Sequence, residues 1–264
     1  MKVLVTVKEV AALEEDFEIE GTSVPEQYLE YDLNEWDDYA VEEAVQLQED
    51  GIAEEVVTAT IGPERSEETI RMALAKGADR AIRVWDDAIE DAGLLDVGVK
   101  TRVLERIVEE EDPDLILTGV QASDDGFSAT GVSLAAAMDY QWASVVNTLD
   151  LDADDGVAKV HRELEGGIEE LTEIDLPAVL TIQTGINEPR YASLRGIRQA
   201  QQKEIAHQTL DDLGLEATAV ESELTLTDMY EPETESDVTV FEGDPDETAG
   251  ALAEVLRDKG VGAE

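Results

Sequence analysis

Short apolar segments alternate with longer amphipathic ones over the first 140 residues of the chain. Valines at every second position predict a buried strand over residues 2–7, and similar runs predict strands over residues 54–61, 80–85 and 114–118. Apolar residues at helical spacing predict helices over residues 40–51, 64–76, 95–111 and 128–138, and residues 8–34 are expected to form a loop. Strands that alternate with helices of this length are typical of right-handed βαβ units. We therefore expect a doubly wound, mostly parallel, Rossmann-like α/β sheet.

The pattern changes after about residue 142. Four closely spaced strands are expected over residues 143–151, 158–164, 168–174 and 178–183, as an extension of the same sheet. Periodicity is lost from about Glu216 until a short strand over residues 238–241 and a final helix from about Glu247, N-capped by Asp246. A connection this long and irregular favours an arm that lies on another surface. We expect an α/β domain over residues 1–215 and an arm with its helix over residues 216–264.

Negative charge dominates the composition. The chain has 65 acidic and 18 basic residues, which gives a formal net charge of −47. A surface of this kind repels phosphate backbones and anionic lipids, which argues against nucleic acids and membrane surfaces as partners. The acids are spread along the whole chain, and molar salt would screen their mutual repulsion. We therefore expect a protein of a halophile, and the alternative is an acidic protein of a mesophile.

Two residue types that carry much of protein chemistry are scarce. The chain has no cysteine and two histidines, which excludes disulfides, thiolate catalysis, iron–sulfur clusters and multi-histidine metal sites. No apolar run approaches the roughly 20 residues that span a bilayer, and the N-terminus enters a strand pattern rather than a signal peptide. The expected location is the cytoplasm.

Candidate ligand-binding segments follow the predicted strands. In an open parallel sheet, ligands bind outside the carboxyl ends of the strands, where the strand order reverses. The candidates are the loop after the first strand, Asn34 to Asp37, Ile61-Gly62 and the loop from Gln121 to Val132. The last, QASDDGFSATGV, places small and hydroxyl residues at a helix start, where free N–H groups and the helix dipole can hold a phosphate. No GxGxxG follows the first strand and no GxxxxGK[ST] occurs, which disfavours a dinucleotide site and a P-loop.

An alternative explains the same loop without a ligand. Asp125 or Ser128 could cap an ordinary helix N-terminus. Asp124 and Asp125 would also repel a phosphate unless salt or a cation screens them. The residues of the loop leave both interpretations open.

Residues 176–203 depart from the acidic bias of the chain. Glu188 is the one acid there, against Arg190, Arg195, Arg198 and Lys203. We expect an exposed Leu194 at the centre of a docking surface, as an apolar anchor among charges that steer a partner. The alternative is that these cations cover helix carbonyls or pair with acids within the fold.

Arg162 and Glu163 are adjacent on a predicted strand, so their side chains are expected on opposite faces and cannot pair with each other. One of the two is therefore expected to face a partner.

Seven segments of the chain resemble the β-subunit of electron-transfer flavoproteins. They are VLVTVKEV (residues 3–10), YAVEEAVQL (39–47), IGPERSEETIRMALAKGADRAI (61–82), GVQASDDGFSATG (119–131), HRELEGGIEEL (161–171), LPAVLT (176–181) and NEPRYASL (187–194). The RELEGG turn and NEPRYASL are the most specific, and the resemblance covers nearly the whole chain. Between Gly167 and Pro177 this chain has one residue more than the family pattern, which a β-bulge could absorb.

The resemblance implies one subunit of a heterodimeric electron carrier. The α-subunit of such a carrier holds most of an FAD, and the β-subunit binds AMP as a structural ligand. Electrons come from dehydrogenases such as acyl-CoA dehydrogenases and pass to a membrane quinone oxidoreductase. By motif position, the AMP contacts would be Thr6, Asn34, Glu35, Trp36, Asp37, Ile61, Gln121, Ala122, Ser123, Asp124, Asp125, Gly126, Phe127, Ser128, Ala129, Thr130, Gly131 and Val132.

The resemblance also implies roles at the surface. Leu194 matches the leucine that anchors partner proteins, and Arg190, Arg195 and Arg198 surround it in the sequence. Arg162 and Glu163 match charged residues that face the mobile flavin domain, and residues 216–264 match an arm that wraps the α-subunit. Leu13 stands where the family has a polar or aromatic residue near the flavin, so the match fails at that position.

Other functions remain as alternatives. Some family members bind a second FAD in place of AMP and bifurcate electrons from NADH, but the SATG loop, with few glycines to admit a pyrophosphate, favours AMP here. A stand-alone adenine-nucleotide module of the stress-protein type would not need the basic segment or the arm. An ATP pyrophosphatase of related fold would need a phosphate loop near the first strand. The sequence thus favours an electron-carrier subunit with no bond-making catalysis of its own.

Overall fold

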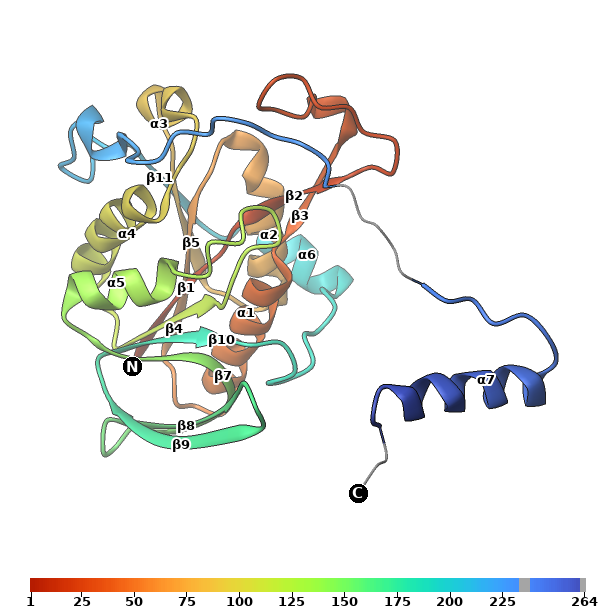
Figure 1. Ribbon diagram of the computed structural model, residues 1–264. Coiled ribbons are helices and arrows are strands. Elements are labelled where there is room, and N and C mark those ends of the chain that lie inside the picture. Colours follow the sequence, from red (N-terminus) through yellow and green to blue (C-terminus); the bar gives the residue numbers. More distant parts are fainter. Residues whose placement is uncertain (233–237, 262–264) are drawn as a thin grey trace. The chain divides into compact units, whose positions relative to one another are not determined.

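The structure is a computed structural model that describes residues 1–232 and 238–261. The chain forms two compact units, one of residues 1–228 and one that begins at Met229. In the first unit, helices cover both faces of a large, mostly parallel sheet (Figure 1). The predicted doubly wound α/β class is therefore confirmed.

The main sheet has nine strands in the described residues, in the order β11-β5-β4-β1-β6-β10-β7-β8-β9. The strands from β11 to β7 are parallel, and β8 and β9 add an antiparallel hairpin, so the strands expected after residue 142 do extend the same sheet. The strand order reverses at β1, which pairs with β4 on one side and β6 on the other. The strand bounds are β1 (Lys2–Thr6), β4 (Glu55–Ile61), β5 (Arg80–Val84), β6 (Leu115–Gly119), β7 (Gln141–Asp152), β8 (Val157–Leu164), β9 (Ile168–Asp175), β10 (Ala178–Ile182) and β11 (Ile205–Gln208).

Two helix layers bury the two faces of this sheet. Val3 and Val5 belong to the core under α1 (Glu35–Glu49) and α2 (Glu67–Lys76), whereas Leu4 belongs to the core under α4 (Val97–Glu111) and α5 (Thr130–Met138). Because successive side chains of a strand point to opposite faces, both sets are buried. This two-sided burial explains why the central strands are almost continuously apolar.

Several elements were not predicted. The expected loop over residues 8–34 contains a two-stranded antiparallel sheet of β2 (Glu9–Leu13) and β3 (Leu29–Leu33), with the short 3-10 helix η1 (Glu26–Tyr28) before β3. Another 3-10 helix, η2 (Glu64–Ser66), precedes α2. The helices α3 (Asp87–Ala92) and α6 (Leu194–Ala200) and the edge strand β11 were also missed. These elements are short and mostly partly exposed, so their apolar pattern is weak.

The register of the β7–β8–β9 sheet corrects one expectation. Strands β8 and β9 pair without interruption from Val157↔Asp175 to Leu164↔Ile168, so the bulge expected between Gly167 and Pro177 is not there. The pairing of β7 with β8 instead shifts between Val146 and Thr148. Val145, next to that shift, has a φ of 62°, a conformation that is uncommon for a β-branched residue.

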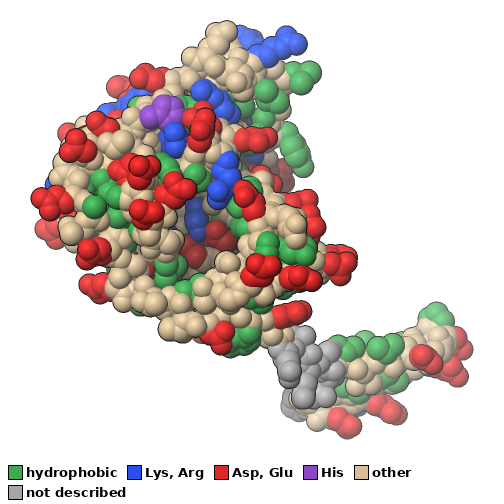
Figure 2. Space-filling view, turned by 90° about the horizontal axis from the view of Figure 1, so that it is seen from above, with side chains coloured by type: hydrophobic (Ala, Val, Ile, Leu, Met, Phe, Trp, Pro, Cys, Tyr) green, Lys and Arg blue, Asp and Glu red, His purple; other side chains and the backbone are tan. Residues whose placement is uncertain are grey.

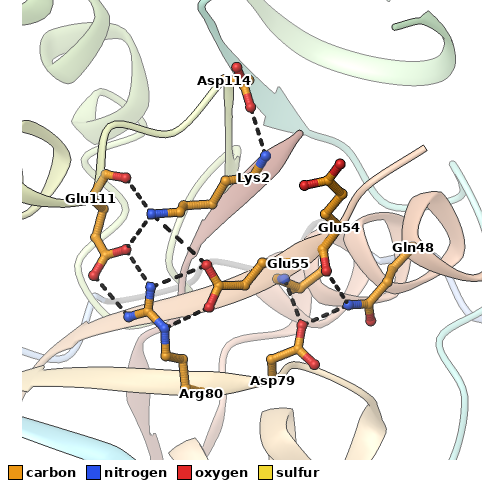
Figure 3. A network of polar contacts seen from close by, with 9 residues as sticks. Lys2, Gln48, Glu54, Glu55, Asp79, Arg80, Glu111 and Asp114 are labelled. Carbon is orange, nitrogen blue, oxygen red and sulfur yellow. Dashed lines mark hydrogen bonds and ion pairs between the residues drawn. The ribbon is translucent and has the colours of Figure 1, made fainter. Parts of the chain in front are cut away.

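Ion pairs join the amino ends of the strands (Figure 3). The Arg80 guanidinium bonds to Glu55 at 2.8 Å and to Glu111 at 2.5 Å, and Lys2 Nζ lies 3.1 Å from Glu111. The Asp79 carboxylate accepts from the Val56 backbone at 2.9 Å. These contacts tie β1, β4, β5 and α4 together at the edge of the sheet opposite the carboxyl ends.

The end of the chain differs in part from the prediction. Residues 217–220 form the 3-10 helix η3 (Ala217–Val220), and the Ala219 carbonyl accepts from Arg102 of α4 at 2.6 Å, so this stretch is part of the first unit. The strand expected over residues 238–241 is not formed, since an alternating segment needs a strand to pair with. The rest of the expected arm includes residues 233–237 and 262–264, which lie outside the described residues.

The final helix, α7 (Pro245–Asp258), begins two residues earlier than expected. Asp244 rather than Asp246 is its N-cap, in a capping box with Glu247. None of the residues of α7 is buried, and Leu252, Val255 and Leu256 are exposed.

Candidate functional site

A cavity of about 390 Å³ lies where the strand order reverses. Its lining comes from the carboxyl ends of β1, β4 and β6, the first residues of α1, the loop before α5 and one face of α4. The space-filling view shows a hollow that contains both acidic and basic side chains (Figure 2). The loops proposed from the sequence as ligand-binding segments therefore meet at one place.

Asp37, in the first turn of α1, lines this cavity and is itself almost fully buried. Its carboxylate is 5% exposed and accepts the backbone N–H of Lys8 at 2.8 Å and that of Gly119 at 3.0 Å. Burial raises its pKa to about 7, although these N–H bonds act in the opposite direction. Asp37 thus joins the ends of β1 and β6 to the start of α1.

Asn34 carries an unpaired polar atom at the cavity wall. Its side-chain N–H donates to the Gln121 carbonyl at 2.8 Å, while its Oδ1 is buried and has no partner among the described residues. A buried acceptor without a donor costs free energy, and such a group is satisfied when a ligand donates to it. The Asn34 amide therefore fits a ligand that carries an N–H or O–H donor.

The loop from Gln121 to Val132 presents an uncapped helix. The N-cap of α5 is Ala129, and no side chain among the described residues accepts from its first turn. The alternative of capping by Asp125 or Ser128 is therefore wrong, because Asp125 Oδ1 accepts from Phe127 N and Ser128 Oγ donates to Gln121 Oε1 at 3.2 Å. Ser128, Ala129 and Thr130 all line the cavity. Free N–H groups and the positive end of the helix dipole are thus available to an anion.

Two lysines that the sequence analysis did not single out neutralise the acids of this loop. Lys8 Nζ bonds to Asp124 and lies 2.8 Å from Asp125, and Lys100 of α4 also bonds to Asp125. Burial works against the charge of Asp125, but the bonds from Lys100 and Lys8 prevail and lower its pKa. The expected repulsion of a phosphate by these two acids is therefore offset by cations of the fold itself.

The residues assigned by motif position divide into two groups. Those that line the cavity are Thr6, Asn34, Asp37, Ile61, Gln121, Ala122, Asp124, Asp125, Ser128, Ala129 and Thr130. Those that do not are Glu35, Trp36, Ser123, Gly126, Phe127, Gly131 and Val132. Several of the second group have other roles, since Trp36 Nε1 donates to Gln183 at 3.0 Å and Gly131 lets α5 approach β6, where a Cβ would lie 2.5 Å from Thr118 Oγ1.

Only some residues of the basic segment, residues 176–203, are exposed and without an ion pair to the described residues. Leu194 is 79% exposed and Tyr191 98% exposed, as expected for a docking anchor and its neighbour. Arg195 and Arg198 are exposed on α6 and make no ion pair with the described residues. Arg190 instead pairs with Glu42 at 2.8 Å and Glu49 at 2.7 Å, so for this residue the alternative of pairing within the fold holds.

Lys203 also follows that alternative. Its ammonium donates to the carbonyls of Leu74, Gly77 and Ala78 at and beyond the end of α2. Burial lowers its pKa.

Arg162 and Glu163 lie on β8, as predicted. Arg162 pairs with Glu170 on β9, at 3.1 Å, whereas Glu163 is exposed. Of the two, Glu163 is the residue left for another surface.

Comparison with known proteins shows the family of the chain. The family model described as "Electron transfer flavoprotein domain" matches residues 22–213. The chain belongs to the electron transfer flavoprotein family. It is 46% identical to the electron transfer flavoprotein subunit beta of Methylophilus methylotrophus over 98% of both chains. It is 39% identical to that of Bradyrhizobium diazoefficiens, over 83% of this chain and 86% of the relative, and 36% identical to that of Homo sapiens, over 98% and 94%.

The family assignment confirms the prediction of an electron-carrier subunit that is not an enzyme. Among the described residues, no helix is long and apolar enough to cross a bilayer. No cluster of three potential metal ligands occurs in that part of the chain either.

The cavity also contains residues that motif positions in electron transfer flavoproteins did not assign. Lys8, Glu9, Arg65 and Lys100 all line it, and Arg65 pairs with Glu9 at 2.9 Å. Lys8 and Glu9 directly follow β1, so the rule of strand-end sites could have found them. Lys100 carries no such signal, because it comes from the middle of a helix sequence.

Proposed function

We propose that the chain is the β-subunit of a heterodimeric electron carrier, with AMP held in the cavity and FAD held mainly by an α-subunit. One observation supports the AMP assignment most strongly, namely that the uncapped start of α5 and Asn34, whose buried Oδ1 has no partner among the described residues, line the same cavity. The α5 N–H groups suit a phosphate and the Asn34 amide suits a donor of the nucleoside. The FAD would supply the reversible electron chemistry, and this chain would supply structure and docking surfaces.

The size and charge of the cavity favour a small nucleotide. Its volume of about 390 Å³ lies near the lower end of ordinary ligand sites, at about 300 to 1,000 Å³. A second FAD, as in bifurcating relatives, would have to place a pyrophosphate and a flavin in the same space. AMP is therefore the preferred ligand, and a second FAD is the alternative.

We also infer the electron route and its surfaces from the exposed residues. Leu194, Arg195 and Arg198 would contact dehydrogenases such as acyl-CoA dehydrogenases, and a membrane quinone oxidoreductase would receive the electrons. Arg190 would hold this segment in place. Glu163 would face the flavin domain, and Arg162 would be held by Glu170 on the other face of the strand.

The final part of the chain would contact the α-subunit. The exposed apolar residues of α7 support this proposal, since an apolar helix face without a partner is unfavourable in water.

The charge supports a halophilic, cytoplasmic setting of archaeal type. With a net charge of −47, the folded state repels itself at low ionic strength, and molar salt screens that repulsion.

The experiment is to co-express the chain with an α-type subunit and to weigh the native complex and its released ligands by mass spectrometry. We expect one FAD and one AMP per heterodimer. Two flavins would support the bifurcating alternative, and a colourless monomer that retains ATP would support the stress-type module. Thr130→Val, which alters the cavity wall, is expected to lower AMP content while Thr172→Val, an equal change on β9, leaves it intact.

A further inference from the structure

We infer that Asp125, assisted by Asp124, restricts the cavity to a nucleotide with a single phosphate group. The inference rests on the proposed adenylate site. The site would accept a monophosphate and reject ADP or ATP because of the carboxylates that pair with the cavity lysines.

Each cation that lines the cavity already pairs with a carboxylate. The cations of the lining in the described residues are Lys8, Arg65 and Lys100. Arg65 pairs with Glu9 at 2.9 Å, and the two lysines pair with Asp124 and Asp125. These three cations face four carboxylates, because Asp37 also lines the cavity, and no cation of this lining is left without a carboxylate partner.

One anionic group can still be accommodated. The uncapped first turn of α5 offers backbone N–H groups and a dipole equivalent to about half a positive charge, which suits one phosphate. Each further phosphate would bring more negative charge beside Asp124 and Asp125 without a new cation. Because like charges repel strongly where water is partly excluded, affinity should fall with each added phosphate.

Asp125 is the central residue of this arrangement. Its side chain is 20% exposed and contacts both lysines, while the Lys100 side chain is 13% exposed and lies 5.0 Å from the Phe127 ring. If the Asp125 charge is removed, Lys100 loses its carboxylate partner and is free to bind additional phosphate oxygens, while Lys8 keeps Asp124. Asn at this position keeps an oxygen for the Phe127 N–H, so the loop should keep its conformation.

The test compares AMP, ADP and ATP on the heterodimer after its bound nucleotide has been removed. Calorimetric titration gives the ratio of ATP to AMP dissociation constants, first for the wild type and then for Asp125→Asn. We expect the wild type to prefer AMP by about 100-fold and the variant to lose about tenfold of that preference, mainly through tighter ATP binding. Lys100→Met removes one matched cation and should shift the ratio in the opposite direction.

Two controls separate the explanations. Asp154→Asn makes the same charge change at an exposed turn outside the cavity, and it should leave the ratio unaltered. In the wild type, the preference should shrink as KCl rises from about 0.2 M to about 2 M, because salt screens the repulsion.

If AMP binds but Asp125→Asn and Asp154→Asn behave alike, the selection role of Asp125 is wrong and the adenylate site stands. If no adenine nucleotide binds to the wild type, the proposed site and this inference both fail.

Discussion

The Asp37 carboxylate lies 3.0 Å from the backbone nitrogen of Gly119 and closes the junction between α1 and β6. A Cβ on residue 119 would lie 2.4 Å from Asp37 Oδ1 and 2.7 Å from Trp36 Cβ. Gly119 is therefore needed for the close approach of the two elements, and Asp37 cannot be bonded in this way if the residue is larger.

Gly119→Ala should destabilise the fold. The new methyl group would push Asp37 away from the Lys8 and Gly119 N–H groups, and overpacking of this kind commonly costs about 1–3 kcal/mol. Urea unfolding in molar KCl measures the change in the free energy of unfolding. Gly250→Ala, at a helical position with open space around it, is the control and should cause no loss. Equal stability of the two variants would contradict the role of the junction.

Asp37 should also make stability depend on pH. Its pKa is about 7 in the folded chain and about 3.9 in the unfolded one, so between these values the folded state binds the extra proton. The free energy of unfolding should therefore fall as pH rises from about 4 to about 7, with a slope from this group of up to about 1.4 kcal/mol per pH unit, and level off above that. Asp37→Asn should lack this component. The measurement is urea unfolding of both proteins from pH 5 to pH 8, and identical slopes would refute the prediction.

Leu194→Ala should slow electron transfer from a partner dehydrogenase while FAD content stays the same. A leucine that is 79% exposed adds little to the fold, whereas truncation of an interface anchor commonly costs about 2 kcal/mol or more. Stopped-flow reduction of the heterodimer by the dehydrogenase measures the rate. Leu171→Ala, at an 81% exposed leucine on β9, is the matched control. Equal rates for both variants would remove Leu194 from the docking surface.

Arg190→Lys should reduce docking indirectly. Arg190 bonds to both oxygens of Glu42 and both oxygens of Glu49, and a lysine cannot reproduce this paired geometry. The Asn187–Arg190 stretch would loosen from α1, and stability would fall by about 2 kcal/mol. The dehydrogenase KM should rise even though Leu194 is present. A change in stability alone, with KM unaltered, would mean that Arg190 supports only the fold.

Low salt should unfold the protein. The melting temperature should rise steeply between about 0.1 M and 2 M KCl as the repulsion within a −47 chain is screened. Glycerol or sucrose, which adds no ions, should not substitute for KCl at low ionic strength. A melting temperature independent of KCl would contradict the inferred halophilic setting.

Elements with a strong local pattern of apolar residues were predicted, and elements with a weak one were missed. The strands β1, β4, β5 and β6 and the helices α1, α2, α4 and α5 were predicted because both faces of the central sheet are buried, which leaves long apolar runs. The β2–β3 hairpin and β11 were missed because their strands are short and partly exposed. Helix α6 was missed because it has only seven residues, and its Gly196 allows it to approach the Ala75 carbonyl of α2.

The sequence predicted where the site lies but not how its charged side chains pair. Parallel strands deliver their carboxyl ends to one edge, so the loops after β1, β4 and β6 could be grouped from the sequence. The pairing of Asp125 with Lys100 could not be predicted from the sequence, because side chains 25 residues apart meet only after α4 and α5 have packed. The uncapped start of α5 was also undetermined, since Asp125 and Ser128 both had the chemistry of a cap.

Helix α1 supplies residues to two separate places in the fold. Its first turn holds Asp37 at the cavity, and its later turns present Glu42 and Glu49 to Arg190. Each residue of a helix turns the chain by about 100°, so one inserted residue between Asp37 and Glu42 would swing both glutamates away from their arginine. The length of this segment should therefore vary far less than its composition when such chains are compared or redesigned.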